Sequence, residues 1–331
     1  MSELPRLTVI GEALIDLVPG DWEVGRGRLA GEAQPGRYEA RPGGSPFNVA
    51  VGLARLEHRV TLMARLADNP FGRLLREHAT AERVDLSHAP AAAEPTTLAV
   101  VGLDREGRAS YDFYLEGTAD WQWSADEIAR MPDDTAVFHM GSLASWTAPG
   151  DEKVYDAAVR LRRDGRALVS YDPNVRPALQ RDPGQARALV ERSVGAAHLV
   201  KASREDAEWL YAGDGLQEVS RRWLELGALL VIITDGPDGA HLFRAGSDPV
   251  RRPGRRVQIA DTIGAGDAFT AGLLGGLALR GLHAPEQLRR CPPGLLAEAV
   301  DDAVLVSALT CERVGADPPT RAELARSQLS P

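Results

Sequence analysis

The chain has 331 residues, of which 44% are hydrophobic and 26% charged, and its formal net charge at pH 7 is −9. These proportions are typical of a globular protein with a full hydrophobic core and exclude a disordered or fibrous chain. The acidic balance argues against nucleic acid as a partner, because phosphates require a basic surface. Cys291 and Cys311 follow no metal-binding or disulfide spacing, which predicts reduced thiols and a cytoplasmic protein. The apolar runs are too short for a membrane span, so no membrane partner is expected.

Short apolar runs alternate with segments of helical periodicity along most of the chain. The runs predict strands, which are, in chain order, LTVIG, VTLMARL, TAVFHMGS, ALVSYDP, AHLVKAS and LLVIITDG. Helical segments include residues 45–57, 151–165 and 215–227, and the last two end in Gly165 and Gly227, a common helix stop. Strands that alternate with helices predict an α/β fold with a parallel sheet covered on both faces.

Two regions interrupt this alternation. Residues from about 18 to 42 are rich in Gly, Arg and Glu, and residues from about 95 to 120 hold two strand patterns around the turn DREG. Ordinary edge hairpins explain both regions. A small β lid that closes over a substrate and excludes water explains them as well. We expect a single domain over residues 1–331 that carries such a lid.

The segment GAGD, which precedes the apolar run AFTAGLLGGLALRG, places Gly264, Ala265 and Gly266 at the start of a predicted helix. Backbone N–H groups at a helix N-terminus have no intrahelical partner, and together with the helix dipole they bind phosphate or a developing oxyanion. Asp267 follows in the first turn, where a carboxylate accepts the proton of an alcohol. The pattern favours phosphoryl transfer to a hydroxyl. A helix-start aspartate beside a tight turn explains the loop alone equally well.

A second glycine pair, Gly43 and Gly44, precedes another predicted helix, with Asn48 in its first turn. Taken alone, it is a turn and a cap. The segments RPGGSPFNVAVGLARLE and DTIGAGDAF together resemble the two signature regions of the ribokinase-like (PfkB) carbohydrate kinases. The segments GEALIDLVP, DPNVRP, KASREDAEWL, TDGPDGA and TCERVGADPPT follow in the expected order. Within that family the chain is most similar to fructokinases. The resemblance implies a three-layer α/β/α fold with a central, mostly parallel sheet and a small β lid.

The resemblance also implies an ATP-dependent kinase that transfers the γ-phosphate to a sugar hydroxyl. Asp267 is then the general base, and the amides of Gly264, Ala265 and Gly266 form the anion hole. The implied sugar-binding residues are Asp16, Gly43, Gly44, Asn48, Asn174 and Arg176. The implied nucleotide-binding residues are Lys201, Thr234, Gly236 and Gly239.

Metal ions enter through the same resemblance. Magnesium is expected to arrive with ATP and to keep most of its waters. The family usually carries an NxxE motif for magnesium and phosphate, and Ser203 and Asp206 stand at the corresponding positions. Asp206 is therefore predicted to contact Mg²⁺ through water, with Glu205 as the alternative. A monovalent cation, K⁺, is implied beside the anion hole, near Asp261, Ile263 and the loop before Gly315. Lid sheets of the family frequently pair between subunits, which implies a homodimer.

The identity of the sugar stays open. Where sugar-acid kinases and many fructokinases carry an arginine in an FYR-like segment, this chain has Leu115 and Glu116. A sugar acid requires positive charge for its carboxylate. The departure argues against a sugar acid and also counts against fructose. The resemblance to fructokinases keeps fructose first, another neutral ketose or polyol second, and 2-keto-3-deoxygluconate third. A catalytically silent sugar or nucleotide sensor on the same fold is a further alternative, against which the base beside the anion hole argues.

Overall fold

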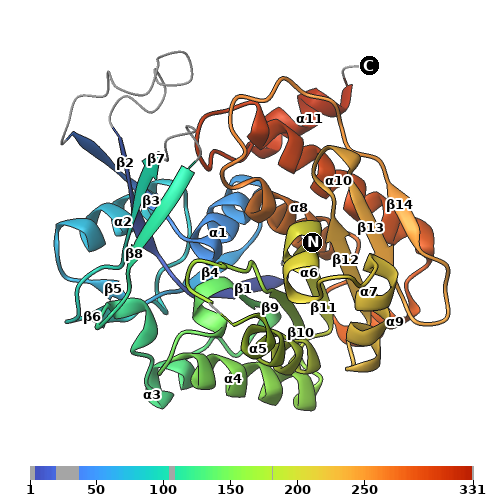
Figure 1. The fold of residues 1–331 in the computed structure, drawn as a ribbon, viewed down its shortest axis with the longest axis horizontal. Coiled ribbons are helices and arrows are strands. Elements are labelled where there is room, and N and C mark those ends of the chain that lie inside the picture. The colour runs from blue at the N-terminus through green and yellow to red at the C-terminus, as the bar shows by residue number, and fades with distance from the viewer. Residues whose placement is uncertain (1–3, 20–36, 104–108, 181, 330–331) are drawn as a thin grey trace.

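The computed structural model describes residues 4–19, 37–103, 109–180 and 182–329. Within these ranges, an eight-stranded sheet lies between two layers of helices (Figure 1). In spatial order its strands are β14 (Val250–Arg252), β13 (Ala240–Phe243), β12 (Leu230–Thr234), β11 (Leu199–Ser203), β10 (Leu168–Asp172), β9 (Thr135–Gly141), β1 (Arg6–Ile10) and β4 (Val60–Met63). The strands from β12 to β4 are parallel, and β13 and β14 are antiparallel. The predicted α/β fold with a mostly parallel sheet is confirmed.

Both faces of the central strands are apolar. On β12, Leu230 and Ile232 pack into the core on one face of the sheet, whereas Val231 and Ile233 pack into the core on the other face. Successive residues of a strand point to opposite faces, so a strand that is covered twice needs apolar residues at every position. This explains why the sequence shows continuous apolar runs in place of an alternating pattern.

The helices form the outer layers (Figure 1). One layer contains α1 (Ser45–Arg55), α2 (Pro70–Ala81), α8 (Ala265–Leu279), α9 (Pro285–Arg290) and α10 (Pro293–Cys311), with α11 (Arg321–Leu329) packed outside α8 and α10. The other layer contains α3 (Ala125–Ala129), α4 (Asp151–Asp164), α5 (Pro183–Ala196), α6 (Arg204–Leu210) and α7 (Leu216–Glu225). Helix α4 ends at the predicted stop, where Gly165 adopts a left-handed φ of 64°. Among the described helices, none has the length and apolarity needed to cross a membrane.

A second, four-stranded sheet stands beside α1 and α2. Its order is β3 (Tyr38–Gly43), β2 (Leu14–Pro19), β7 (Leu98–Leu103) and β8 (Ala109–Tyr114). Strands β7 and β8 form the predicted antiparallel hairpin. Its turn at 104–108, like most of the first interrupting region at 20–36, lies outside the described residues. The role of this sheet as a lid stays a prediction. A short pair, β5 (Leu66–Ala67) and β6 (Ala91–Ala92), completes the strands of the described ranges.

Asp16 lies in this second sheet. Its position after the first predicted strand, LTVIG, would suit the carboxyl end of a strand of the parallel sheet, but Asp16 belongs to β2, where it pairs with Arg41 of β3. Strand β1 already pairs with β4 on one side and with β9 on the other, so β2, which follows β1 in the chain, cannot pair beside it. Strand β11 also runs two residues beyond Lys201, which therefore lies inside the strand.

Candidate active site

Two cavities meet at the N-terminus of α8. The smaller, of about 410 Å³, lies between the four-stranded sheet, the start of α1 and the start of α8. The larger, of about 770 Å³, lies beyond the carboxyl ends of β11 and β12. Asn174, Arg176, Thr262 and Gly266 line both and so mark their boundary. Crevices outside the carboxyl ends of parallel strands are the usual ligand sites of such sheets.

The loop that begins α8 requires glycine for a steric reason. Gly264 caps the helix with a left-handed φ of 75°, and a Cβ there would lie 2.6 Å from Cβ of Ala316. The Ala265 N–H donates to the carbonyl of Thr262 at 3.2 Å. The three predicted anion-hole residues therefore stand at a helix N-terminus, with the Ala265 amide bonded within the loop.

Lys201 brings a positive charge to this N-terminus. A Cβ built on Gly266 would lie 3.2 Å from Lys201 Nζ, so a side chain there would occupy the space beside the ammonium. The lysine is buried, and its Nζ lies 2.8 Å from Oδ2 of Asp172. Burial lowers the pKa of Lys201, but the attraction of Asp172 outweighs it and leaves the pKa raised. The ammonium is thus charged and lies beside Gly266, at the N-terminus of α8.

Asp267 lies in the first turn of α8 and lines the smaller cavity. Its Oδ1 accepts a hydrogen bond from Ser45 Oγ at 2.7 Å, and its Oδ2 accepts one from Asn48 Nδ2 at 2.9 Å. Burial raises the pKa of Asp267, and the hydrogen bonds from Ser45 and Asn48 oppose that rise. A carboxylate with a raised pKa and a fixed orientation is suited to accept a proton from a hydroxyl in the cavity.

The glycine pair before α1 allows close approach of two chain segments. A Cβ on Gly43 would lie 2.2 Å from Oδ2 of Asp16, and a Cβ on Gly44, whose φ is 104°, would lie 2.6 Å from the carbonyl oxygen of Glu12. Gly44 lines the smaller cavity, whereas Gly43 is absent from the described lining and instead makes room for the Asp16 carboxylate. Asn48 both lines the cavity and holds Asp267.

Two further acids face the smaller cavity. Burial raises the pKa of Asp16 to about 7, a rise that Arg176 opposes and Asp267 reinforces. Burial also raises the pKa of Glu12 to about 7. The sequence reasoning missed Glu12, although it follows directly after β1, at the edge where parallel strands present their ligand contacts. It also missed Ser45, which stands in the first turn of α1 beside the predicted Gly44.

Arg176 and Asn174 form one unit at the boundary of the two cavities. The guanidinium of Arg176 donates to Asn174 Oδ1 at 2.6 Å and to the Asn174 carbonyl at 3.0 Å. Asn174 adopts φ 39°, a conformation that non-glycine residues seldom take. The bonds that hold this turn keep Arg176 at a position where it lines both cavities.

The remaining predicted nucleotide residues line the larger cavity. Thr234 ends β12, and Gly236 and Gly239 lie in the turn between β12 and β13, so the segment is a β-hairpin whose turn faces the cavity. A Cβ on Gly236 would meet no atom within 4 Å, so space is open there. Apolar side chains gather in the same cavity and suit a nucleobase; they are Val257, Ile259, Phe269, Val304, Ala308 and Cys311.

The predicted magnesium contact, Asp206, lines the larger cavity and also caps α6. Its Oδ2 accepts the N–H of Ser203 at 3.2 Å, and its Oδ1 accepts the N–H of Val175 at 3.0 Å. Burial and the nearby Asp172 raise its pKa. The described residues hold no cluster of three or more His, Cys, Asp or Glu side chains arranged for a metal ion.

Asp261, predicted near a monovalent cation, ties two loops together. Its Oδ1 accepts the N–H of Thr262 at 2.7 Å, and its Oδ2 accepts the N–H of Gly315 at 3.0 Å. The carboxylate therefore joins the loop before α8 to the loop after α10. Ile263, the other residue predicted at this ion, lines the smaller cavity.

A model of the pfkB family carbohydrate kinases matches residues 4–323. The chain belongs to this family. Its relatives include the fructokinase of Rhizobium leguminosarum bv. trifolii, 34% identical over 278 residues that cover 84% of this chain and 81% of the relative. The fructokinase of Klebsiella pneumoniae is 33% identical over 298 residues, which cover 88% and 89% of the two chains. The predicted family and the activity of a sugar kinase are confirmed.

Solved structures agree with this assignment. The fructokinase of Xylella fastidiosa with bound ATP superposes with a TM-score of 0.85 at 26% identity, over 98% of this chain and 99% of that one. A double mutant of the Vibrio cholerae O395 fructokinase, in a form bound to fructose, ADP and a potassium ion, has a TM-score of 0.83 at 28% identity, with the same coverage. The aminoimidazole riboside kinase of Salmonella enterica has a TM-score of 0.80 at 26% identity, over 98% of this chain and all of that one.

Proposed function

We propose that this sugar kinase transfers the γ-phosphate of ATP to a hydroxyl of a neutral ketose, with fructose as the first choice. One observation carries the proposal: Asp267 lines the smaller cavity, and Gly266, one residue before it, lines both cavities. A hydroxyl beside the carboxylate in the smaller cavity would thus face a phosphate in the larger one across the N-terminus of α8. Such alignment of two reactants supplies much of the rate of phosphoryl transfer.

The charge of the smaller cavity favours a neutral sugar. Among its described lining residues, Arg176 is the one basic side chain, and three are acids, namely Glu12, Asp16 and Asp267. Carboxyl groups bind the vicinal hydroxyls of a sugar through hydrogen bonds, whereas the carboxylate of a sugar acid would be repelled. The fructokinase relatives support the same choice. Leu115 and Glu116, which replace the expected arginine segment, are absent from the described lining.

In the proposed reaction, each residue at the start of α8 and around it has a separate role. Asp267, oriented by Ser45 and Asn48, takes the proton of the sugar hydroxyl as its oxygen attacks the γ-phosphorus of ATP. The bond from the γ-phosphorus to the bridging oxygen breaks, and ADP leaves with that electron pair. The amides of Gly264 and Gly266 and the ammonium of Lys201 stabilise the negative charge of the transferring group. Asp172 keeps Lys201 in place.

The larger cavity suits a magnesium ion that arrives with ATP. The carboxyl oxygens of Asp206 each accept a backbone N–H already, so contact through a water fits them better than direct ligation. Glu205 lines the same cavity. When bound, the ion would neutralise phosphate charge.

The anion hole also suits K⁺ beside it. Asp261 draws the backbone of two loops together there, and a carboxylate with neighbouring carbonyls is a hard oxygen donor set. The structure of the Vibrio cholerae fructokinase in a potassium-bound form supports K⁺ as the ion.

We further propose that the four-stranded sheet is the lid of a single kinase domain over residues 1–331, and that it pairs in a homodimer. Asp16 of β2 and Tyr111 and Phe113 of β8 line the smaller cavity, so movement of this sheet would open and close it. Its outer strands in the described ranges, β3 and β8, carry the exposed Tyr38 and Tyr114, as a covered edge would need. Light scattering coupled to size-exclusion chromatography tests the dimer, and a monomer at all concentrations would contradict it.

A coupled ADP-release assay tests the proposed substrate. With ATP and magnesium, we expect the highest kcat/KM for fructose in a panel that includes other ketoses, ribose, polyols, aminoimidazole riboside and 2-keto-3-deoxygluconate. Preferred turnover of the sugar acid or of the riboside would overturn the choice of a neutral ketose. Sugar binding by calorimetry without turnover of any of these compounds would overturn the kinase mechanism in favour of a sensor.

A further inference from the structure

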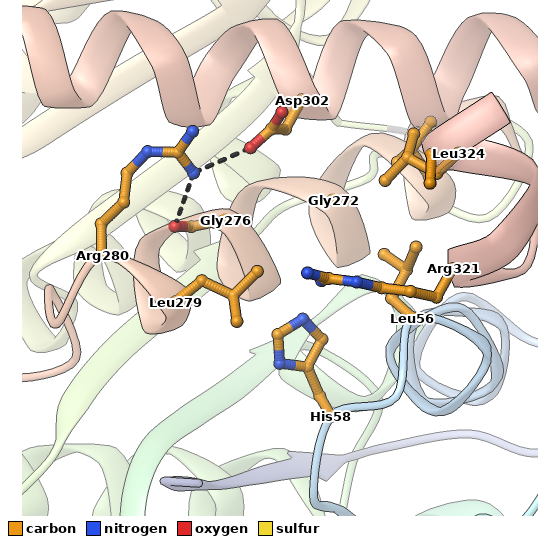
Figure 2. Close-up of a pocket in the computed structure, with 11 residues that line it drawn as sticks. Leu56, His58, Gly272, Gly276, Leu279, Arg280, Asp302, Arg321 and Leu324 are labelled. Carbon is orange, nitrogen blue, oxygen red and sulfur yellow. Dashed lines mark hydrogen bonds and ion pairs between the residues drawn. The ribbon is translucent and has the colours of Figure 1, made fainter. Parts of the chain in front are cut away.

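A third cavity, of about 400 Å³, lies further along α8 toward its C-terminus (Figure 2). The end of α1, one face of α8, α10 and α11 form its walls. None of its described lining residues belongs to either of the other two cavities. It is therefore a separate cavity that shares one helix with the active site.

His58 is a buried polar side chain that lacks a partner here. It is 8% exposed, and its Nδ1 has no hydrogen-bond partner among the described atoms. In Figure 2 the ring points into the cavity, between Leu279 and Arg321. Burial, with the charge of Arg321, lowers its pKa to about 4, so the ring is neutral near pH 7 and holds one N–H donor. Nδ1 is too enclosed for a solvent-sized molecule to reach, so a ligand in the cavity would meet Nε2, for which no hydrogen bond occurs among the described residues. Buried polar groups are almost always hydrogen-bonded, so an unbonded ring nitrogen at the cavity wall suits a ligand or water.

Arg321 brings a charge to the same place. Its side chain extends from the start of α11 over Leu56 toward His58 (Figure 2), and no ion pair or hydrogen bond of its guanidinium occurs among the described residues. Arg280 differs, since it pairs with Asp302 at 2.8 Å and donates to the Gly276 carbonyl at 3.0 Å. The charges of Arg280 and Asp302 cancel, so the described lining of the cavity keeps one net positive charge, that of Arg321.

We propose that this cavity binds a small organic anion with a single carboxylate, held by Arg321 and His58. A guanidinium donates two parallel N–H bonds to the two oxygens of a carboxylate, and the neutral imidazole adds a further N–H donor. Leu56, Leu279 and Leu324 offer an apolar surface for the rest of the molecule. The single uncompensated charge and the adjacent Asp302 disfavour a dianion such as a phosphate ester.

Helix α8 connects this cavity to the active site. Gly272 and Gly276 form part of the wall, and Asp267 stands in the first turn of the same helix. A ligand that contacts the helix changes its position or rigidity, and by linkage the sugar and the ligand then alter each other's binding. Occupancy is therefore expected to change the KM for the sugar or kcat.

Binding is tested on the whole protein with butyrate and benzoate as carboxylate probes and with butanol and benzyl alcohol as uncharged analogues. Calorimetry and protein NMR should show saturable binding of the carboxylates, with Kd on the order of 1 mM for ligands of this size. The substitution Arg321→Leu should weaken binding at least ~10-fold, because it removes the charged partner. Arg326→Leu removes the same charge from another position of α11 and should leave the affinity unchanged.

Three outcomes would overturn the proposal. They are equal binding of butanol and butyrate, equal binding by the protein and its Arg321→Leu variant, and tighter binding of inorganic phosphate than of either carboxylate. The thermal midpoint of Arg321→Leu shows whether the variant is folded, and it should be close to that of the original protein.

The link to catalysis rests on the proposed function and is measured separately. In the fructose assay, saturating butyrate should change KM or kcat by about 2- to 10-fold, with no change for Arg321→Leu. Bound butyrate without any effect on turnover would overturn the link through α8. Because calorimetry and NMR need no turnover, failure of the kinase proposal leaves the binding result interpretable.

Discussion

The substitution Asp267→Asn tests the proposed base directly. It keeps the shape of the side chain and removes its ability to take a proton. In the folded protein, Ser45 and Asn48 donate hydrogen bonds to the two carboxylate oxygens at 2.7 and 2.9 Å. An amide accepts one of these bonds and presents an NH₂ group to the other donor. The side chain stays in place with one hydrogen bond fewer.

The expected loss of rate follows from the role of a general base. Such catalysis contributes ~10² to ~10⁴ in rate, which corresponds to about 2.7 to 5.4 kcal/mol of activation free energy. We expect kcat with fructose to fall by at least ~10²-fold, with ATP affinity largely unchanged. Removal of a buried negative charge offsets the lost hydrogen bond, so the free energy of unfolding should change by no more than about 1 to 2 kcal/mol.

The assay measures ADP release at saturating fructose and ATP, with nucleotide affinity by calorimetry. Asp120→Asn is the matched control, since Asp120 is also a buried acid but is absent from the described lining of both cavities of the candidate active site. This control should keep kcat within about threefold of the original protein. A kcat of Asp267→Asn in the same range would remove Asp267 from the role of base and refute the mechanism.

Three further predictions concern the anion hole, stability and the lid. Gly266→Ala places a methyl group about 3.2 Å from Lys201 Nζ, so kcat should fall by ~10-fold or more. The control Gly195→Ala, which has no neighbour closer than 3.8 Å, should leave kcat unchanged. Equal kcat values for the two variants would show that the phosphoryl group binds elsewhere. Burial raises the pKa of Asp120 to about 7. Between about pH 4 and 7 the Asp120 carboxyl is therefore protonated in the folded chain but ionised in the unfolded chain. The free energy of unfolding then falls as pH rises, by up to about 1.4 kcal/mol per pH unit from this group. Asp120→Asn should flatten that slope in urea unfolding at about pH 5 and pH 7, and an unchanged slope would contradict the raised pKa. Fructose should slow amide hydrogen exchange in β8. An exchange rate that is the same with and without fructose would count against a lid.

The fold could be predicted because its determinants are local. The run at 230–233 is apolar at every position, as a strand covered on both faces requires, and the structure buries alternate residues in the two cores. Gly165 ends α4 with the left-handed φ that glycine adopts at little cost. Signals of this kind lie within a few residues of the feature that they specify.

Contacts within the candidate site could be predicted only in part. The loop around Asp267 and the glycines before α1 were visible as motifs, but the bond from Ser45 to Asp267 joins residues 222 positions apart. The pairing of Lys201 with Asp172 likewise depends on the order of β10 and β11 in the sheet. Glu12 lies inside the quoted segment GEALIDLVP, shortly after β1, but the segment alone does not show that its side chain faces a cavity. Such contacts depend on how helices and strands pack in three dimensions, which cannot be read from the local sequence.

The glycines of α8 explain how packing far from the chemistry positions the base. Gly272 and Gly275 cost about 1 kcal/mol each in a helix interior relative to alanine. A Cβ on Gly272 would lie 2.9 Å from Cα of Ala303 in α10, and one on Gly275 would lie 2.4 Å from Nε2 of His58. The glycines therefore let α8 approach α10 and the end of α1 more closely than any side chain allows. Because α1 also carries the residues that hold Asp267, the same close packing fixes the proposed base, its hydrogen-bond donors and the wall of the third cavity relative to one another.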